Sequence, residues 1–155
     1  MNIFLEKFVD RKFKKPGKAL DLGAGKFYDV ACMRQQGWKC EGVDKRTGVN
    51  LERPYLSKHG PFDLVFSNYV IHKLKNKSQV IKTACNNLKS GGWLFIHTFD
   101  KSDKNSSSSI TRMSLVQLLT HSGFHNIHTA VFRYFDNDPT HKHWHKILEA
   151  IAQRK

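Results

Sequence analysis

A glycine-rich turn flanked by acids is the feature of this 155-residue sequence that points most clearly to chemistry. Asp21 stands two residues before Gly23 and four before Gly25, and Asp44 follows Asp21 by 23 residues. Glycine at such a turn lets the backbone approach a ligand closely, because it carries no Cβ. A carboxylate at the position of Asp44 can accept hydrogen bonds from both hydroxyls of a ribose. The pattern therefore predicts a ligand that contains a nucleoside.

Two common nucleotide-binding patterns do not fit this turn. The dinucleotide pattern GxGxxG needs a third glycine where this chain has Tyr28, whose bulk opposes close packing of helix and strand. The P-loop pattern needs Gly-Lys-Ser/Thr, but Gly25-Lys26 is followed by Phe27. NAD, FAD and P-loop nucleotides are therefore disfavoured.

The hydrophobic pattern predicts the elements that must position the turn. Short apolar runs that end at glycine or polar residues predict strands, and apolar residues at a spacing of three and four predict helices. The expected strands cover residues 18–23, 39–44, 62–70, 93–99, 124–134 and 143–151, and the expected helices cover residues 2–13, 27–37, 78–88 and 111–122. The polar, serine-rich segment 100–109 is expected to be a mobile loop.

The order of these elements predicts the fold class. Strand, helix and strand follow one another within about 30 residues around the glycine turn, which implies parallel pairing with a right-handed crossover. The last two strands have no helix between them and should pair as an antiparallel hairpin. We predict one α/β domain over residues 1–155, with a Rossmann-like, mostly parallel twisted sheet, helices on both faces and an antiparallel C-terminal hairpin.

In their order and spacing, these landmarks resemble the class I S-adenosylmethionine-dependent methyltransferases over nearly the whole chain. Residues 21–25 resemble the family's first motif, Asp44 its ribose-binding acid, residues 62–68 its fourth-strand motif and residues 88–94 the approach to its fifth strand. Residues 143–155 are similar to the last strand of the small tellurite-resistance type. The resemblance implies an enzyme that transfers a methyl group from S-adenosylmethionine and releases S-adenosylhomocysteine.

The resemblance also implies which residues hold this cofactor. Asp21 would reach its amino-acid end, the turn would lie under it, and Asp44 would bind the ribose. The full set of expected cofactor-binding residues is Asp21, Gly23, Ala24, Gly25, Asp44, Lys45, Asn50, Leu51, Ser67 and Asn68. Methyl transfer is an in-line displacement, so orientation of the reactants supplies much of the rate, up to ~7–11 kcal/mol.

The chain departs from the family pattern at two places. Phe27 stands where many members have a third glycine, which would narrow the pocket at the methionine end. Only 18 residues separate Asp44 from Asp63, where a helix and a strand normally sit, so we predict a fold shortened between strands 2 and 4 of the family. Residues 49–51 would then be the remnant of the third strand. Asn50 would accept a hydrogen bond from adenine and Leu51 would pack on its ring; the alternative is that Asn50 is a turn residue.

Two residues near the end of the 62–70 strand are candidates for catalysis, because the family lines its reaction centre there. They are Tyr69 and His72. His72 is the candidate general base, since the unperturbed pKa of histidine lies near neutral. The alternative is an ordinary residue at a helix start that touches the cofactor. Together with residues 100–109, these two side chains would cover the acceptor.

Three alternating histidines near the C-terminus suggest a metal site, because alternate residues of a strand share one face. They are His141, His143 and His145. No carboxylate or thiol lies at fitting range in the sequence, so we expect no metal. A solvated strand face, or a surface for an anionic acceptor, is the expected role.

The charge and composition limit the partners. Lys and Arg number 26 against 13 Asp and Glu, so the net charge is +13, which attracts anions. We expect a small-molecule acceptor, because the chain has no added recognition domain; the charge keeps an RNA or other nucleic-acid acceptor open, and a non-catalytic cofactor-binding module is a third hypothesis. Three cysteines without a CxxC pair, and no apolar run of ~18 residues, predict a cytoplasmic protein without membrane contact. Monomer and homodimer both fit.

Overall fold

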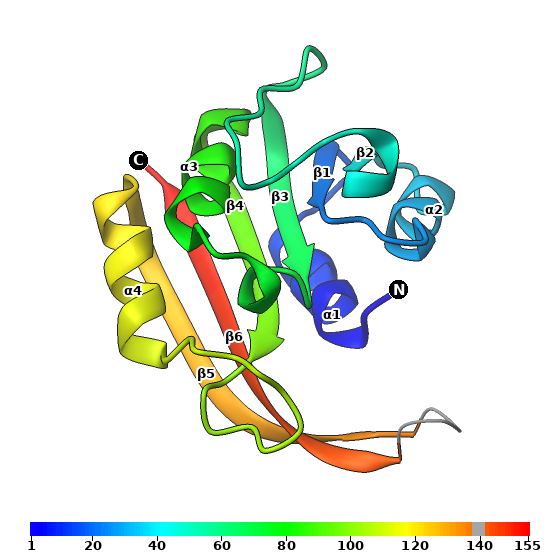
Figure 1. Cartoon of the computed structure of the whole chain (residues 1–155). Helices are drawn as coiled ribbons and strands as arrows, with labels where there is room; N and C mark the ends of the chain where they lie inside the picture. The colour runs from blue at the N-terminus through cyan, green and yellow to red at the C-terminus, as the bar shows by residue number, and fades with distance from the viewer. Residues whose placement is uncertain (138–141) are drawn as a thin grey trace.

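One six-stranded sheet forms the centre of the computed structural model, which describes residues 1–137 and 142–155 (Figure 1). The strand order is β2-β1-β3-β4-β6-β5. Neighbours among the first four strands pair in parallel, whereas β6 pairs antiparallel with both β4 and β5. The predicted mixed sheet with an antiparallel C-terminal hairpin is therefore confirmed. The strands are β1 Lys18–Leu22, β2 Lys39–Val43, β3 Phe62–Asn68, β4 Leu88–Phe99, β5 Phe124–Asp136 and β6 His143–Arg154.

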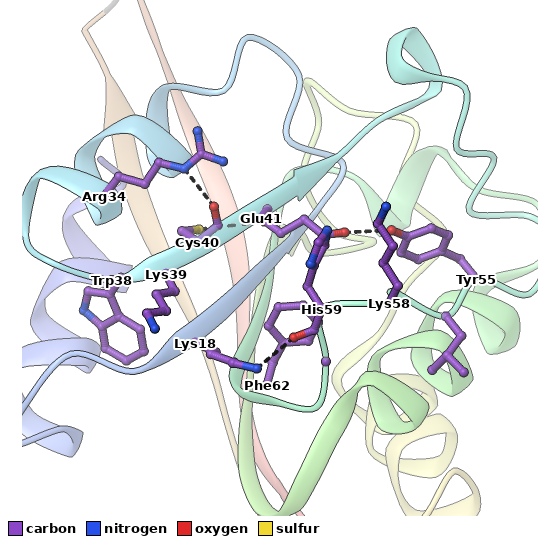
Figure 2. A pocket seen from close by; sticks show the side chains of 12 residues that line it. Lys18, Arg34, Trp38, Lys39, Cys40, Glu41, Tyr55, Lys58, His59 and Phe62 are labelled. Atoms are coloured by element: carbon purple, nitrogen blue, oxygen red, sulfur yellow. Dashed lines mark hydrogen bonds between the residues drawn. The ribbon is translucent and has the colours of Figure 1, made fainter.

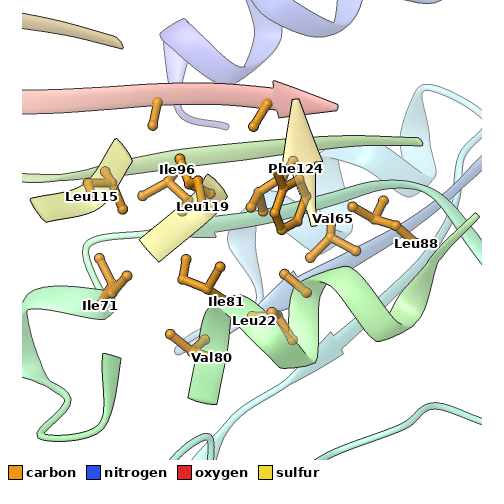
Figure 3. Packing of buried hydrophobic residues seen from close by; sticks show 14 of the residues in the cluster. Leu22, Val65, Ile71, Val80, Ile81, Leu88, Ile96, Leu115, Leu119 and Phe124 are labelled. Atoms are coloured by element: carbon orange, nitrogen blue, oxygen red, sulfur yellow. The ribbon is translucent and has the colours of Figure 1, made fainter. Parts of the chain in front are cut away.

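Helices cover both faces of the sheet, as predicted, because successive residues of a buried strand point to opposite sides. In β3, Val65 packs with the core under α3 and α4, while Leu64 and Phe66 pack with the core under α1 and α2. Figure 3 shows the first of these cores, where Leu115 and Leu119 of α4 meet Ile81 of α3. The helices are α1 Ile3–Lys12, α2 Tyr28–Gln35, α3 Lys77–Asn87 and α4 Arg112–His121, with 3-10 turns η1 Lys45–Thr47 and η2 Ile71–Lys73.

The connection from β2 to β3 is shortened, as the residue count predicts. It contains only η1 and irregular backbone, so β2 forms one edge of the sheet. The expectation of a remnant strand at residues 49–51 is wrong. Asn50 Oδ1 accepts from the backbone N–H of Glu52, which makes a turn, and Leu51 is buried in the core under α3. Too few residues are present for the chain to return as a strand beside β2.

Buried hydrogen bonds fasten the rest of this connection to the sheet. Tyr55 and Ser57 each donate a hydroxyl hydrogen bond of 2.7 Å to the carboxylate of Glu41 in β2. Asn87, which is 1% exposed, donates to the carbonyls of Tyr55 and Thr83 and accepts from the N–H of Ser57. One buried amide therefore holds the segment in place of a helix.

Two other expectations need correction. The strand expected at 93–99 begins earlier, at Leu88, which pairs with Phe62; the register then shifts and regular pairing resumes at Trp93. The serine-rich segment is anchored to the protein: the carboxylate of Asp103 accepts from the N–H of Lys146, and Ser108 donates to the carbonyl of Phe99 at 2.7 Å. No helix in the described part of the chain combines the length and hydropathy that crossing a membrane requires.

The three hydrogen bonds of Asn87 predict a large effect on stability. Asn87→Ala should lower the free energy of unfolding by ~2–4 kcal/mol, because it leaves a buried N–H and buried carbonyls without partners. Asn86→Ala is the matched control, since Asn86 is the exposed neighbour on the same helix; it should change stability by less than ~0.5 kcal/mol. Urea unfolding measures both, and equal stabilities of the two variants would contradict the assignment.

Candidate functional site

The glycine turn after β1 is bonded directly to the end of β2. The N–H groups of Gly23 and Ala24 donate to the carbonyl of Val43 at 2.8 and 3.0 Å. The N–H of Gly25 donates to Asp44 Oδ2 at 3.0 Å. The predicted turn and the predicted ribose-binding acid therefore meet at the carboxyl edge of the parallel strands, where sheets of this kind bind their ligands.

The two glycines of the turn have different roles. Gly23 has a φ of +93°, and a Cβ there would lie 2.4 Å from Val70 Cγ2, so no side chain fits. Gly25 has a φ of +51°, and a Cβ there would meet no atom within 4 Å. Gly23 is thus required for packing, whereas the backbone at Gly25 faces open space. That opening is what a ligand lying on the turn requires.

The carboxylate of Asp44 has acceptor capacity beyond the hydrogen bonds it makes within the protein. The N–H of Arg46 donates to Oδ1 and the N–H of Gly25 donates to Oδ2, both at 3.0 Å. These hydrogen bonds, that from Arg46 first, hold the pKa of Asp44 below its ordinary value. Each ionised oxygen keeps a lone pair, so Asp44 can accept from two ribose hydroxyls. The residues present therefore fit the nucleoside part of the expected cofactor.

Acids gather at the same edge of a protein that is otherwise strongly basic. Asp21 is buried, and burial, followed by the charges of Asp29 and Asp44, raises its pKa well above the ordinary value. Asp29, in the first turn of α2, accepts from Asn68 Nδ2 at 2.7 Å. S-adenosylmethionine carries a sulfonium and an ammonium, and both cations would be stabilised beside these carboxylates. Sequence analysis missed Asp29, although an acid one helical turn after a glycine motif was the available signal.

The remaining predicted cofactor residues divide into two groups. Asn68 stays at the site, and its buried Oδ1 has no hydrogen-bond partner among the described residues. Ser67 donates to the carbonyl of Leu22 at 2.8 Å and holds two strands together. Lys45 and Asn50 are exposed beyond β2, and the Asn50 oxygen is engaged by the turn described above. The turn alternative for Asn50 thus matches the geometry, and Leu51 packs inward.

An aromatic cavity of about 470 Å³ opens beside the end of β3. Tyr69 lies in its wall with a φ of +58°, and its N–H donates to the carbonyl of His97 at 2.7 Å. A tyrosine in this conformation is strained, and such strain concentrates at functional sites. Burial raises the pKa of Tyr69, so its phenol keeps its proton. Phe4, Phe99 and His145 also line the cavity.

Two histidines near this cavity have contrasting environments. His72 lies with Nδ1 3.0 Å from Thr98 Oγ1, and burial lowers its pKa to about 4. It is not among the residues that line the cavity. His145 does line it, and its Nδ1 lies 3.0 Å from a carboxylate oxygen of Asp103, whose side chain is fully buried. A carboxylate on one ring nitrogen fixes the orientation of the imidazole and leaves the other nitrogen for chemistry.

The Asp103–His145 pair rules out one of the two expected roles of the C-terminal histidines, a solvated strand face. His145 is buried, so the strand face that carries it is not solvated. Its ring lies 4.5 Å from that of His143, and in the described ranges no three potential ligands are placed to hold a metal ion. His141 lies outside the described residues. No local pattern in the sequence indicates this pair, because Asp103 and His145 are 42 residues apart.

A family model described as a methyltransferase domain matches residues 3–138, and the chain therefore belongs to the methyltransferase domain family. No curated protein resembles it closely enough in sequence to count as a match. Among solved structures, an S-adenosylmethionine-dependent methyltransferase from Methanosarcina mazei superposes with a TM-score of 0.77 at 15% identity, covering 95% of this chain and 96% of that one. The predictions of a methyltransferase and of the class I S-adenosylmethionine-dependent fold are confirmed.

Two further structures carry ligands. The 1,6-didemethyltoxoflavin-N1-methyltransferase of Burkholderia thailandensis, bound to 1,6-didemethyltoxoflavin and S-adenosylhomocysteine, has a TM-score of 0.71 at 19% identity and covers 96% of this chain and 76% of that one. Phosphoethanolamine N-methyltransferase 2 of Haemonchus contortus, bound to S-adenosylmethionine, has a TM-score of 0.71 at 14% identity. This chain covers 52% of it, and 99% of this chain is covered.

The burial of Asp21 predicts a pH-dependent effect on stability. Because its folded-state pKa is raised, the carboxyl favours the fold below the unfolded pKa and loses that contribution as pH rises through the folded pKa. Asp21→Asn, which mimics the protonated form, should therefore exceed the wild type in stability at pH 8, by at least ~1 kcal/mol. The difference should vanish near pH 4. Urea unfolding at both pH values tests this, with exposed Asp10→Asn as the control; a wild type as stable as Asp21→Asn at pH 8 would contradict it.

Proposed function

We propose that this methyltransferase binds S-adenosylmethionine at the carboxyl edge of β1 and β2 and methylates a small-molecule acceptor held in the aromatic cavity beside β3. The supporting observation is the junction of the two sites. The turn at Gly25 and the carboxylate of Asp44 suit the nucleoside, and the cavity begins at Tyr69, directly after Asn68. When bound, the cofactor supplies an electrophilic methyl group.

The residues around the turn have separate tasks in this proposal. Asp44 binds the ribose, and the backbone at Gly25 lets the cofactor lie close to the turn. Asp21 and Asp29 favour its cationic end, and Asn68, whose amide donates to Asp29, holds that carboxylate in place. Each of these groups binds the cofactor or orients it, and orientation of the reactants is the main requirement of an in-line displacement.

The cavity is suited to an organic acceptor of modest size. Phe4, Tyr69 and Phe99 supply apolar walls that exclude water, while the Tyr69 phenol and the tip of His145 offer polar contacts. The Burkholderia protein is named for 1,6-didemethyltoxoflavin and the Haemonchus protein for phosphoethanolamine, and these small acceptors support the proposal. A volume of about 470 Å³ favours such a molecule over a nucleic acid, the alternative that the charge suggests.

His145 is the residue that we infer takes a proton from the acceptor. A base is needed only where the acceptor atom still carries its proton. His145 faces the cavity and is oriented by Asp103, whereas His72 is bonded to Thr98 and its pKa of about 4 makes it a weak base. His72 then acts by supporting Phe99, with which its ring is in contact at 4.9 Å.

Cofactor binding should depend on the carboxylate of Asp44. Asp44→Asn should weaken S-adenosylhomocysteine at least ~10-fold, because the amide nitrogen cannot accept from a ribose hydroxyl. Asp10→Asn removes one negative charge from the exposed face of α1 and should leave affinity unchanged. Calorimetric titration measures both. The proposal fails if the wild type does not bind, or if the two variants bind equally well.

The choice of base can be tested on any acceptor that the wild type methylates in a panel of small phenols, amines and nitrogen heterocycles. His145→Gln should lower kcat by ~10²–10⁴ while KM and the affinity for S-adenosylhomocysteine stay unchanged. His72→Gln should lower kcat by less than ~10-fold. A larger loss with His72→Gln would reverse the assignment.

A further inference from the structure

A second cavity, of about 1000 Å³, lies at the amino ends of the parallel strands, opposite the end that carries the glycine turn (Figure 2). Lys18, Lys39 and Phe62, the first residues of β1, β2 and β3, line it. The turn and Asp44 follow the last residues of β1 and β2, so the length of the strands separates the two sites. Neither the family match nor the proposed methyl transfer gives this cavity a role.

The shortened connection between β2 and β3 forms part of the cavity wall. In place of a helix and a strand, irregular backbone passes between β2 and α3, where Tyr55 and Ser57 bond to Glu41 and Asn87, and residues 55, 56 and 58–60 line the cavity. Side chains are bonded to β2 beside the cavity: Arg34 Nε donates to the carbonyl of Cys40 at 2.8 Å, and the carboxylate of Glu41 accepts from the hydroxyls of Tyr55 and Ser57.

The lining of the cavity carries an excess of positive charge. Its cations are Lys18, Arg34, Lys39 and Lys58, with His59 beside them, and its only acid is Glu41. The carboxylate of Glu41 already accepts two hydroxyl hydrogen bonds, which occupy it on the side of the connection. Four cations around one hollow repel one another, and an anion placed between them relieves that repulsion.

Two of the cations are held by hydrogen bonds to backbone carbonyls. Lys18 Nζ donates to the carbonyl of His59 at 3.0 Å, which fixes the ammonium at the rim. Arg34 uses Nε for the carbonyl of Cys40, so its two terminal nitrogens keep their donors in the planar geometry that binds phosphate oxygens in pairs. Arg34, Lys39 and Lys58 are exposed. Tyr55 and Leu56 add an apolar wall, and the side chain of Leu56 is 71% exposed.

We propose that this cavity binds a phosphate-bearing ligand of nucleotide size. Its phosphates would lie among Arg34, Lys39 and Lys58, and its less polar part against Tyr55 and Leu56. The volume lies at the upper end of the range of small-molecule sites, ~300–1000 Å³. The phosphates belong either to a free nucleotide or to a segment of nucleic acid, and the experiment below separates these two sources.

The test compares two double charge reversals that lower the net charge of +13 by the same amount. Lys39→Glu/Lys58→Glu changes the cavity, and Lys82→Glu/Lys101→Glu changes exposed lysines outside its lining. Each protein is titrated by calorimetry with inorganic triphosphate, adenosine triphosphate and a short single-stranded oligouridine. Saturating S-adenosylhomocysteine is present throughout, so that the nucleoside site is blocked.

The cavity variant should lose affinity for at least one probe by ~10-fold or more relative to the wild type, while the control variant loses less than ~3-fold. Binding of triphosphate or adenosine triphosphate identifies a free nucleotide as the source, and binding of oligouridine alone identifies nucleic acid. Absence of binding by every probe, or equal losses in both variants, overturns the proposal. Both variants should bind S-adenosylhomocysteine like the wild type, so failure here is distinguishable from failure of the cofactor site.

Discussion

The structure depends on one local arrangement, the hydrogen bonding of the glycine turn to the end of β2. Three successive N–H groups, from Gly23 to Gly25, donate to acceptors at Val43 and Asp44. These bonds leave the backbone exposed toward the ligand, fix the carboxylate of Asp44 and align β1 with β2. The requirement for φ above zero at Gly23, with Val70 packed against it, then fixes the path of the chain after β3. The cofactor edge and the acceptor cavity are therefore parts of one packed unit.

The two ends of the parallel strands differ in the sign of the charge that gathers there. The carboxyl edge holds Asp21, Asp29 and Asp44, although the whole chain has a charge of +13. The amino edge has an excess of lysine and arginine around its cavity. The two ends of the same strands thus favour ligands of opposite charge. The net charge of the chain therefore does not predict the local charge at either end of the strands.

The sequence predicts the sheet and the turn well because both depend on local patterns. A few consecutive residues are enough to recognise the apolar runs of the strands and the glycines at positions 23 and 25. The site residues that depend on distant contacts are not readable in this way. The role of His145 depends on its hydrogen bond to Asp103, and the role of Asn87 depends on its hydrogen bond to Ser57, 30 residues earlier in the chain. The position of His72 after β3 favours it as a base, but the burial that lowers its pKa is a tertiary effect. Placing Leu51 at the ligand depends on a remnant of the missing third strand, whereas Leu51 is buried in the core under α3.

The position of β6 has a consequence for how the protein folds during synthesis. β6 is the last strand in the sequence, yet it lies between β4 and β5 and pairs with both along most of its length. Until these residues leave the ribosome, β5 has no strand to pair with, and the parallel strands end at an open edge at β4. His145 belongs to β6, so the acceptor cavity forms only when the C-terminal strand inserts. The nascent chain can thus bring the glycine turn and Asp44 together early. The cavity beside Tyr69 forms later, because it depends on the slow, non-local pairing of β6 with β4.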